Sequence, residues 1–344
     1  MTEVHIIGLD LAKRVFQAHG AASDGTVVFR KKLSRSQVLT FLSSQPRCIV
    51  AMEACASAHH WGREIGALGH EVRLIAPAYV KPFVKRQKND MADAEAISEA
   101  ASRANMRFVP VKSAEKQASA VAFKTRDLLV RQRSQTINAL RGHAGEFGFI
   151  APQGITHASK LSAWIRSADC DMPEAARAMC LILVEMVDRL SEQISQLNIE
   201  ITSRARRDET SRRLMTIPGF GPIIATAVET MAPPASVFKR GRDFAAWMGL
   251  TPRQNSSGGK VKLGRTSKMG HRDLRRLLII GASAVVRWAA RQNGRTSAWL
   301  ARMLERKPPM LVIMALANKM ARIAWALMAK GGVYKLSPEM AATG

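Results

Sequence analysis

The chain has 344 residues, of which 47% are hydrophobic, so it is long enough for two or three domains with their own cores and is not an intrinsically disordered protein. Its 52 lysines and arginines outnumber 27 aspartates and glutamates, and the formal net charge of +25 exceeds what solubility requires. We therefore expect a polyanionic partner, and nucleic acid is the first candidate.

The sequence also argues against a membrane protein and against a protein stabilised by disulfides. The start MTEVHIIGLD lacks the basic and then apolar layout of a signal peptide. The apolar run at 310–329 contains Lys319 and Arg322, and a bilayer core penalises each of these charges by about 2.5–3.5 kcal/mol. The four cysteines show no CxxC pairing, so neither a zinc site nor a disulfide framework is indicated. We expect a cytoplasmic protein without a membrane partner, in which 310–329 is a buried helix.

The first 113 residues predict a mixed sheet with helices packed on it. Apolar or β-branched runs at 4–10, 14–20 and 26–32 predict a three-stranded antiparallel meander. The next segment reads as a helix with Ser34 as its N-cap, and strands at 47–53 and 70–77 are separated by a helix that ends near residue 68. With a helix from about residue 90, the order βββ-α-β-α-β-α is typical of an α/β domain.

The region 114–207 reads as helical, with helices predicted over 114–140 and 173–207. The segment between them, about 142–172, shows no clear pattern. In the second helix, steps of four and three residues separate Leu183, Val187, Leu190, Ile194, Leu197 and Ile201. This spacing predicts a coiled coil between helices or between subunits, while an ordinary bundle helix remains the alternative.

The region 208–344 follows a basic stretch at 204–213 and is predicted to be mainly helical. Its IPGFGP motif at 217–222 places Gly219 and Gly221 between two apolar helices. Backbone N–H groups in such a hairpin can bind a phosphate without reading sequence, as in a helix-hairpin-helix element. A plain αα-hairpin that needs glycine gives the same pattern.

Four carboxylates suggest a metal site. Asp10 and Glu53 each end a predicted buried strand, and Asp90 and Asp93 lie three residues apart on one face of a predicted helix. Four such groups in one place repel each other unless a cation neutralises them, and their hard oxygens suit Mg²⁺ or Mn²⁺. Paired metals of this kind activate phosphodiesters. Alternatively, Asp90 caps a helix and Asp10 is a turn residue.

The stretch PRQNSSGGK at 252–260 places Ser256 and Ser257 beside a glycine turn. No His–Asp pair adjoins them in sequence, so the residues alone favour turn serines over a nucleophile. Cations that could hold a phosphate and stabilise charge on phosphorus surround the two serines, namely Lys260, Lys262, Arg265, Lys268, Arg272, Arg275 and Arg276.

Six stretches together resemble the DEDD insertion-sequence transposases of the IS110 family. They are GLDLAK at 8–13, Glu53 after a strand, KNDMADA at 88–94, IPGFGPIIA at 217–225, FAAWMGLTPRQNSSGGK at 244–260 and LGRTSKMGHRDLRRLL at 263–278. The resemblance runs through nearly the whole chain in the right order. Two departures, Asn89 in place of a frequent Thr and ACASAHHW after the glutamate, leave the carboxylates in place.

The resemblance implies a DNA recombinase with three parts: a RuvC-like, RNase-H-like catalytic domain at 1–113, a helical coiled-coil region at 114–207 and an α-helical domain with the serine loop at 208–344. The acidic tetrad of the family carries onto Asp10, Glu53, Asp90 and Asp93, which would bind Mg²⁺ or Mn²⁺. Its nucleophilic serine carries onto Ser257, with Ser256 as the neighbour.

The resemblance also implies partners. Family members use a non-coding bridge RNA that pairs with donor and target DNA, and they form dimers that pair into tetramers on DNA. Their serine forms a covalent phosphoserine link to DNA, and the carboxylates of a neighbouring protomer complete the site. Two alternatives remain open: a metal-only nuclease of the Holliday-junction type, in which Ser257 is a turn residue, and a non-catalytic RNA- or DNA-binding protein.

Overall fold

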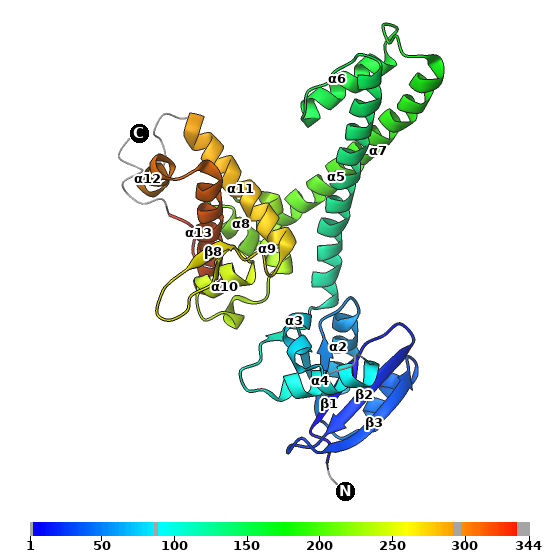
Figure 1. The fold of residues 1–344 in the computed structure, drawn as a ribbon, viewed down its shortest axis with the longest axis vertical. Coiled ribbons are helices and arrows are strands. Elements are labelled where there is room, and N and C mark those ends of the chain that lie inside the picture. Colours follow the sequence, from blue (N-terminus) through cyan, green and yellow to red (C-terminus); the bar gives the residue numbers. More distant parts are fainter. Residues whose placement is uncertain (1–2, 86–88, 292–296, 336–344) are drawn as a thin grey trace. The chain divides into compact units, whose positions relative to one another are not determined.

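The computed structural model describes residues 3–85, 89–291 and 297–335 and divides into two compact units, Met1–Gln117 and Ala118–Gly344 (Figure 1). The second unit contains both the region 114–207, apart from its first four residues, and the region 208–344. The three-part division of the chain stays a prediction.

The first unit is built on a six-stranded mixed sheet. The strand order is β3 (Val27–Ser34), β2 (Val15–Ala21), β1 (Ile6–Asp10), β4 (Ile49–Glu53), β5 (Glu71–Ile75) and β6 (Phe108–Val109). β1 pairs antiparallel with β2 and parallel with β4, so the pairing of the strands changes from antiparallel to parallel at β1, near the centre of the sheet. This confirms the predicted mixed sheet, to which the structure adds the short β6, an element that the sequence patterns did not indicate.

Helices cover both faces of this sheet. α1 (Gln37–Ser43) and α2 (Ala58–Ala67) share a core with Ile7 and Leu9 of β1. α4 (Asp90–Ser102) packs on the other face, where its apolar side chains meet Ile6 of β1 and Ala51 of β4. Because side chains alternate along a strand, Asp10 and Glu53 belong to the face that α4 covers. Between β5 and α4 lie α3 (Pro77–Val80) and η1 (Lys81–Phe83).

The prediction that Ser34 caps the first helix is wrong. Ser34 is the last residue of β3, where it pairs with Val15, and the N-cap of α1 is Ser36. The strand pairing holds Ser34 in the sheet, and its backbone N–H donates to Oε1 of Gln37 at 2.9 Å.

Two long helices form one end of the second unit (Figure 1). Both were predicted: α5 (Ala114–Glu146) and α7 (Glu174–Arg207). They run antiparallel, because residues early in α5 contact residues late in α7 through the hydrogen-bonded pairs Ser119–Arg204, Arg126–Asn198 and Arg133–Ser191. α6 (Ile155–Arg166), in the segment that showed no pattern, packs beside α7 and shares a core with both long helices.

The buried stripe of α7 partly follows the predicted seam. Val187, Leu190, Ile194 and Ile201 are buried, while Leu183 and Leu197 are only half-buried. On the N-terminal side of Val187 the buried stripe passes through Cys180 and Val184, whereas the predicted seam passes through Leu183, one residue before Val184. The part of the stripe from Cys180 to Val187 shares a core with residues 137–144 of α5 in the same chain.

The remaining elements complete the second unit, and its main core lies among their helices. They are α8 (Glu209–Leu214), α9 (Pro222–Met231), η2 (Ala235–Val237), α10 (Gly241–Trp247), β7 (Pro252–Gln254), β8 (Leu263–Thr266), α11 (Arg272–Arg291), α12 (Ala298–Arg306) and α13 (Pro309–Lys330). α13 is long and apolar enough to cross a membrane by length and composition, which on its own is weak evidence. Its buried side chains, among them Val312, Ala317 and Met320, pack in this core with α10 and α11, as expected for a core helix.

Candidate functional site

Three of the four predicted carboxylates come together at one edge of the first unit. Asp10 ends β1, and Asp90 and Asp93 occupy the first turn of α4. One carboxylate oxygen from each lies within 4.8 Å of the others, with Asp90 exposed and the other two half-buried. Residues 80 positions apart in sequence thus form one acidic cluster.

A glycine makes this approach possible. Gly8 lies two residues before Asp10 on the same face of β1, beneath α4. A Cβ atom added at Gly8 would lie 2.2 Å from the Ala94 carbonyl oxygen and 2.7 Å from the Ser98 nitrogen. Only glycine therefore lets the backbone of α4 lie directly on β1, with its first turn beside Asp10.

The start of α4 is fixed by a side-chain cap. The N-cap is Asn89, whose Oδ1 accepts a hydrogen bond from the Ala92 nitrogen at 2.8 Å. The alternative reading in which Asp90 caps the helix is wrong, because Asp90 is the first helical residue. Asp90 and Asp93 stand where the helix dipole favours negative charge, and their carboxylates remain available to a cation.

Glu53 is close to the cluster in the fold but is not part of it. Leu9 of β1 pairs with Met52 of β4, so Asp10 and Glu53 end neighbouring parallel strands at the same level. The group of carboxylates within 4.8 Å of one another nevertheless contains only the other three. The structure thus brings three members of the predicted tetrad together and places the fourth on the adjacent strand end.

A third acidic residue of α4, which the sequence patterns did not single out, ties the helix to the sheet. Glu95 accepts hydrogen bonds from Lys85 at 2.5 Å and from Arg30 of β3 at 3.2 Å. The hydrogen bond from Lys85, with its positive charge, holds the pKa of Glu95 below its usual value. Nearby on β2, burial lowers the pKa of His19. Glu95 therefore holds α4 in position rather than adding to the acidic cluster.

The acidic cluster fits a divalent cation. All its donors are carboxylate oxygens, which hard cations such as Mg²⁺ and Mn²⁺ prefer, and three negative charges this close together are stabilised by a positive one. An exposed member leaves a side of the cluster open to a substrate. The residues present can thus hold the metal that the sequence predicts.

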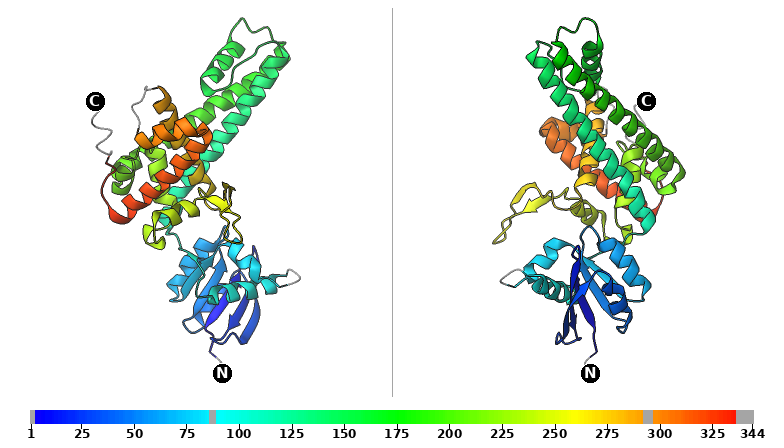
Figure 2. Two further views of the ribbon diagram at one scale, coloured as in Figure 1. Left: turned by 60° about the vertical axis from the view of Figure 1, so that its left-hand side comes forward. Right: turned by 90° about the vertical axis from the view of Figure 1, so that its right-hand side faces the viewer.

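The serine loop forms a β-hairpin in the second unit, drawn in yellow in Figure 2. β7 and β8 pair antiparallel, and beyond them the strands close through a turn in which the Lys260 nitrogen donates to the Ser257 carbonyl oxygen at 3.0 Å. Gly258 and Gly259 both have positive φ values, +54° and +75°, as the two central residues of a type I′ turn require. Ser257 is therefore the residue at which the hairpin tip begins.

The two adjacent serines have different environments. The Ser256 hydroxyl accepts a hydrogen bond from the Lys262 nitrogen at 3.0 Å and so helps to close the hairpin. Ser257 is exposed, and its hydroxyl makes no hydrogen bond with any residue in the described ranges. Ser256 thus has a structural role, whereas the hydroxyl of Ser257 is available to a ligand.

The base of the hairpin is packed tightly by two glycines. Gly249 and Gly270 have positive φ values of +72° and +91°, and a Cβ atom on either would lie 1.8 Å from a carbonyl oxygen across the base. Arg275 closes the same region by donating to the Met248 carbonyl oxygen at 3.0 Å and to that of Met269 at 3.4 Å. The hairpin therefore leaves the helical core from a defined position.

The cations of the hairpin divide into two groups. Arg275 donates to a backbone carbonyl at the base, and Arg276 forms an ion pair with Asp127 of α5, so both already have partners within the fold and their contact with a phosphate stays a prediction. The other predicted cations are all exposed: Lys260, Lys262, Arg265, Lys268 and Arg272. No aspartate or glutamate occurs between Asp243 and Asp273, so this surface is purely basic.

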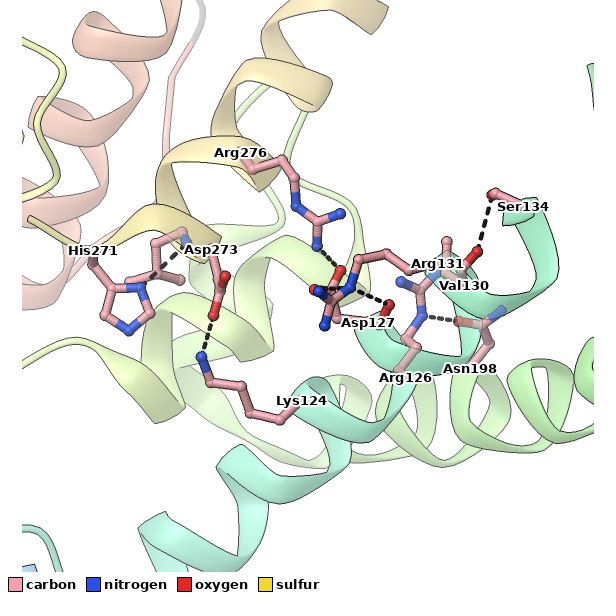
Figure 3. A network of polar contacts seen from close by, with 11 residues as sticks. Lys124, Arg126, Asp127, Val130, Arg131, Ser134, Asn198, His271, Asp273 and Arg276 are labelled. Carbon is pink, nitrogen blue, oxygen red and sulfur yellow. Dashed lines mark hydrogen bonds and ion pairs between the residues drawn. The ribbon is translucent and has the colours of Figure 1, made fainter. Parts of the chain in front are cut away.

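A polar network fastens the start of α11, just after the hairpin, to α5 (Figure 3). Asp273 of α11 pairs with Lys124 of α5, and Arg276 pairs with Asp127. Asp127 also pairs with Arg131 of its own helix, with 3.5 Å between Nε and Oδ2. The helix that follows the hairpin is thereby fixed to the long helix pair.

The IPGFGP hairpin joins α8 to α9, with Gly221 as the N-cap of α9. Gly219 has φ +85°, and a Cβ atom there would lie 2.7 Å from the Gly281 carbonyl oxygen of α11. Gly219 is thus required for packing against α11, whereas the space beside Gly221 is open. Contact between nucleic acid and the two glycines stays a prediction.

Two protein-family models match this chain. A family model described as DEDD_Tnp_IS110, Transposase, matches residues 7–147, which include all four carboxylates, and a second, Transposase IS116/IS110/IS902 family, matches residues 211–297, which include the serine hairpin. A probable family 20 transposase of Pseudomonas aeruginosa is 47% identical over 331 residues, or 96% of this chain and 98% of that protein. The chain belongs to the IS110/IS116/IS902 family of transposases.

Two further transposases are similar to this chain over nearly its whole length. A putative transposase of Sinorhizobium fredii, y4pF/y4sB, is 45% identical and covers 98% of this chain and 87% of its own length. The transposase for insertion sequence element IS1328 of Yersinia enterocolitica is 40% identical, over 97% of this chain and 99% of its own length. This protein is a DNA transposase, and its DEDD domain together with the acidic cluster indicates the use of a divalent metal.

Proposed function

We propose that this transposase cuts and rejoins DNA through a covalent link between Ser257 and a DNA phosphate, guided in the cytoplasm by a non-coding bridge RNA. The position of Ser257 is the observation that supports this most: its exposed hydroxyl, without a hydrogen-bond partner in the described ranges, stands at the tip of a hairpin free of carboxylates. We propose Ser257 rather than Ser256 because the Ser256 hydroxyl helps to close the hairpin.

In the proposed step, the Ser257 Oγ attacks a backbone phosphorus. A bond forms between Oγ and phosphorus, one of the two ester bonds to deoxyribose breaks, and the proton of the serine hydroxyl ends on the departing sugar oxygen. The bond energy of the cleaved phosphodiester is retained in the phosphoserine, and a sugar hydroxyl of another strand reverses the step to rejoin the DNA.

Asp10, Asp90 and Asp93 are proposed to hold Mg²⁺ or Mn²⁺, with Glu53 joining them from the neighbouring strand end. A bound divalent cation supplies Lewis-acid polarisation of a phosphate oxygen. The support is the geometry of the acidic cluster and the absence of a general base beside the serines in sequence. We propose that the carboxylates of one protomer and the Ser257 of another complete a shared site.

The exposed cations of the hairpin are proposed to bind the DNA backbone and to stabilise charge on the reacting phosphate. They are Lys260, Lys262, Arg265, Lys268 and Arg272. The backbone around Gly219 and Gly221, as a helix-hairpin-helix element, is proposed to add sequence-independent phosphate contacts, for which the open space beside Gly221 is the support. Sequence choice then comes from base pairing with the guide RNA.

The division into catalytic, coiled-coil and serine-hairpin regions, and assembly into dimers that pair into tetramers on DNA, are part of the same proposal. The antiparallel contacts of α5 and α7 support a coiled coil within the chain. The formal charge of +25 supports a large polyanionic partner beyond DNA, and sequencing of the RNA that co-purifies with the protein would identify it.

The decisive experiment is recovery of a protein–DNA adduct from a stalled reaction. Ser257→Ala should lose both the adduct and recombination while still binding DNA, since the surrounding cations are unchanged. Ser256→Ala is the matched control: it removes one hydrogen bond of the hairpin, worth about 1 kcal/mol, and should keep most of both activities. Asp10→Asn should abolish strand cleavage without loss of the fold.

Two results would overturn the proposal. Mass spectrometry could place the link on Ser256, which would correct the nucleophile by one residue. Cleavage by the wild-type protein without any adduct would instead favour the metal-only nuclease, in which Ser257 is a turn residue.

A further inference from the structure

A second basic surface lies in the first unit. An open cavity of about 560 Å³, here named the edge pocket, is lined by Lys13, Arg14, Ser34, Arg35, Ser36, His60 and Trp61. Every lining side chain is a cation, a hydroxyl or an aromatic ring, and none is a carboxylate. This composition matches an anionic ligand.

The edge pocket lies at the same edge of the sheet as the acidic cluster. Lys13 and Arg14 form the turn after β1, three and four residues beyond Asp10. Ser34 is paired with Val15 at the start of β2, so the end of β3 also reaches this edge. The fourth strand ends here as well, and α2, which supplies His60 and Trp61, begins five residues after it.

The two features occupy opposite faces of that edge. Trp61 is buried in the core that α1 and α2 form on one face, whereas Asp90 and Asp93 belong to α4 on the other. A nucleic-acid strand that crosses the edge would therefore meet the acidic cluster on one side of the sheet and the edge pocket on the other.

The cations of the edge pocket are not neutralised by the protein. Lys13, Arg14 and Arg35 are exposed and make no ion pair within residues 3–85, 89–291 and 297–335. His60, which also lines the pocket, has an acidic neighbour, because its Nδ1 lies 3.8 Å from the Glu64 Oε1. Three uncompensated positive charges around one open concavity attract an anionic ligand.

One of these cations is held in place by aromatic rings. The Arg35 guanidinium lies 5.1 Å from the Trp61 ring centre and 5.9 Å from that of Phe16. Stacking on buried rings reduces the freedom that Arg35 would lose on binding a ligand. Trp61 itself is only 3% exposed, so it offers no face on which a base could stack. The groups presented are hydrogen-bond donors for phosphate, without base readout.

We propose that the edge pocket binds the phosphodiester backbone of the DNA strand on which the acidic cluster acts, and so holds that strand across the edge of the sheet. This inference rests on the proposed role of the acidic cluster in strand cleavage and assigns that unit its own DNA-binding surface. Binding there is independent of base sequence.

The test compares the salt dependence of DNA binding by full-length variants, with EDTA present so that no strand is cut. In the double variant Lys13→Gln and Arg14→Gln, the slope of log affinity against log salt should fall by about 0.9 for each phosphate that the protein no longer neutralises, thus by about 1–2 in all. Both side chains are exposed, so the fold should be unaffected. The matched control is Arg47→Gln, an exposed arginine before β4 at the opposite edge of the sheet, which should leave the slope unchanged.

Three outcomes would overturn the proposal: a wild-type slope in the double variant, an equal change in the Arg47→Gln control, or a change confined to binding of the co-purifying RNA. Asp10→Asn, measured alongside, separates this proposal from that of the metal site. Loss of cleavage in Asp10→Asn with a wild-type slope in the double variant would refute the edge pocket alone.

Discussion

Gly8 is the residue on which the geometry of the acidic cluster most directly depends, and Gly8→Ala should disrupt the cluster without touching a carboxylate. The new Cβ atom would lie 2.2 Å from the Ala94 carbonyl oxygen, whereas unbonded carbon and oxygen atoms stay about 3.3 Å apart. α4 must therefore move away from β1 by about 1 Å. Overpacking of this kind costs about 1–3 kcal/mol of folding free energy.

The effect on metal binding should be larger than the effect on stability. Asp90 and Asp93 move with α4 while Asp10 stays on β1, and ligand distances in metal sites tolerate only about 0.2 Å. A displacement of about 1 Å in an active site can cost about 100-fold in rate. We expect Mn²⁺ affinity, measured by calorimetry, and strand cleavage both to fall strongly in a variant that remains folded by circular dichroism.

The matched control is Gly66→Ala in α2 of the same unit. A Cβ atom at Gly66 meets nothing nearer than Val72 Cγ2 at 4.0 Å, so the change should stabilise the helix by about 0.5–1 kcal/mol and leave metal binding intact. If Gly8→Ala binds Mn²⁺ and cleaves DNA as well as the wild type does, α4 does not depend on Gly8 for its position and the argument from packing fails.

Two further predictions concern stability. Glu95→Gln removes a carboxylate whose pKa is lowered in the folded state by Lys85, so the stability that it contributes is present above its unfolded pKa and is lost as the pH falls through the folded value. The free energy of unfolding in urea should therefore be larger for the wild type than for the variant near pH 6, and the gap should narrow as the pH falls below the usual glutamate pKa of 4.5. A gap that does not change with pH would contradict this. Ile194→Ala should cost about 2–5 kcal/mol because Ile194 is 4% exposed on the buried face of α7, whereas Ile199→Ala, at a residue 68% exposed, should cost less than about 0.5 kcal/mol. Equal unfolding midpoints for these two variants would show that the contact between α5 and α7 adds little to stability.

Local sequence patterns predicted most of the secondary structure of this transposase. Runs of apolar residues marked the strands of the meander and those that end in Asp10 and Glu53, because a buried strand must be apolar over its length. The apolar spacing of the long helices likewise marked α5 and α7. Pattern failed at β6, whose two residues are too few to show a repeat, and at α6, whose buried face of Ala158, Leu161 and Ile165 was not recognised within a segment rich in glycine and polar residues. It also misplaced the cap at Ser34 because strand pairing extended β3.

The sequence by itself determined the chemistry of the site: acidic residues at strand and helix ends, a serine before two glycines, and a large excess of positive charge. Only the tertiary structure decided which of these groups meet. Asp10 reaches Asp90 and Asp93 because Gly8 admits the backbone of α4, and Ser256 is distinguished from Ser257 by a hydrogen bond from across the hairpin. Distances between residues far apart in sequence depend on how backbones pack, and side-chain periodicity within a single element contains no information about that.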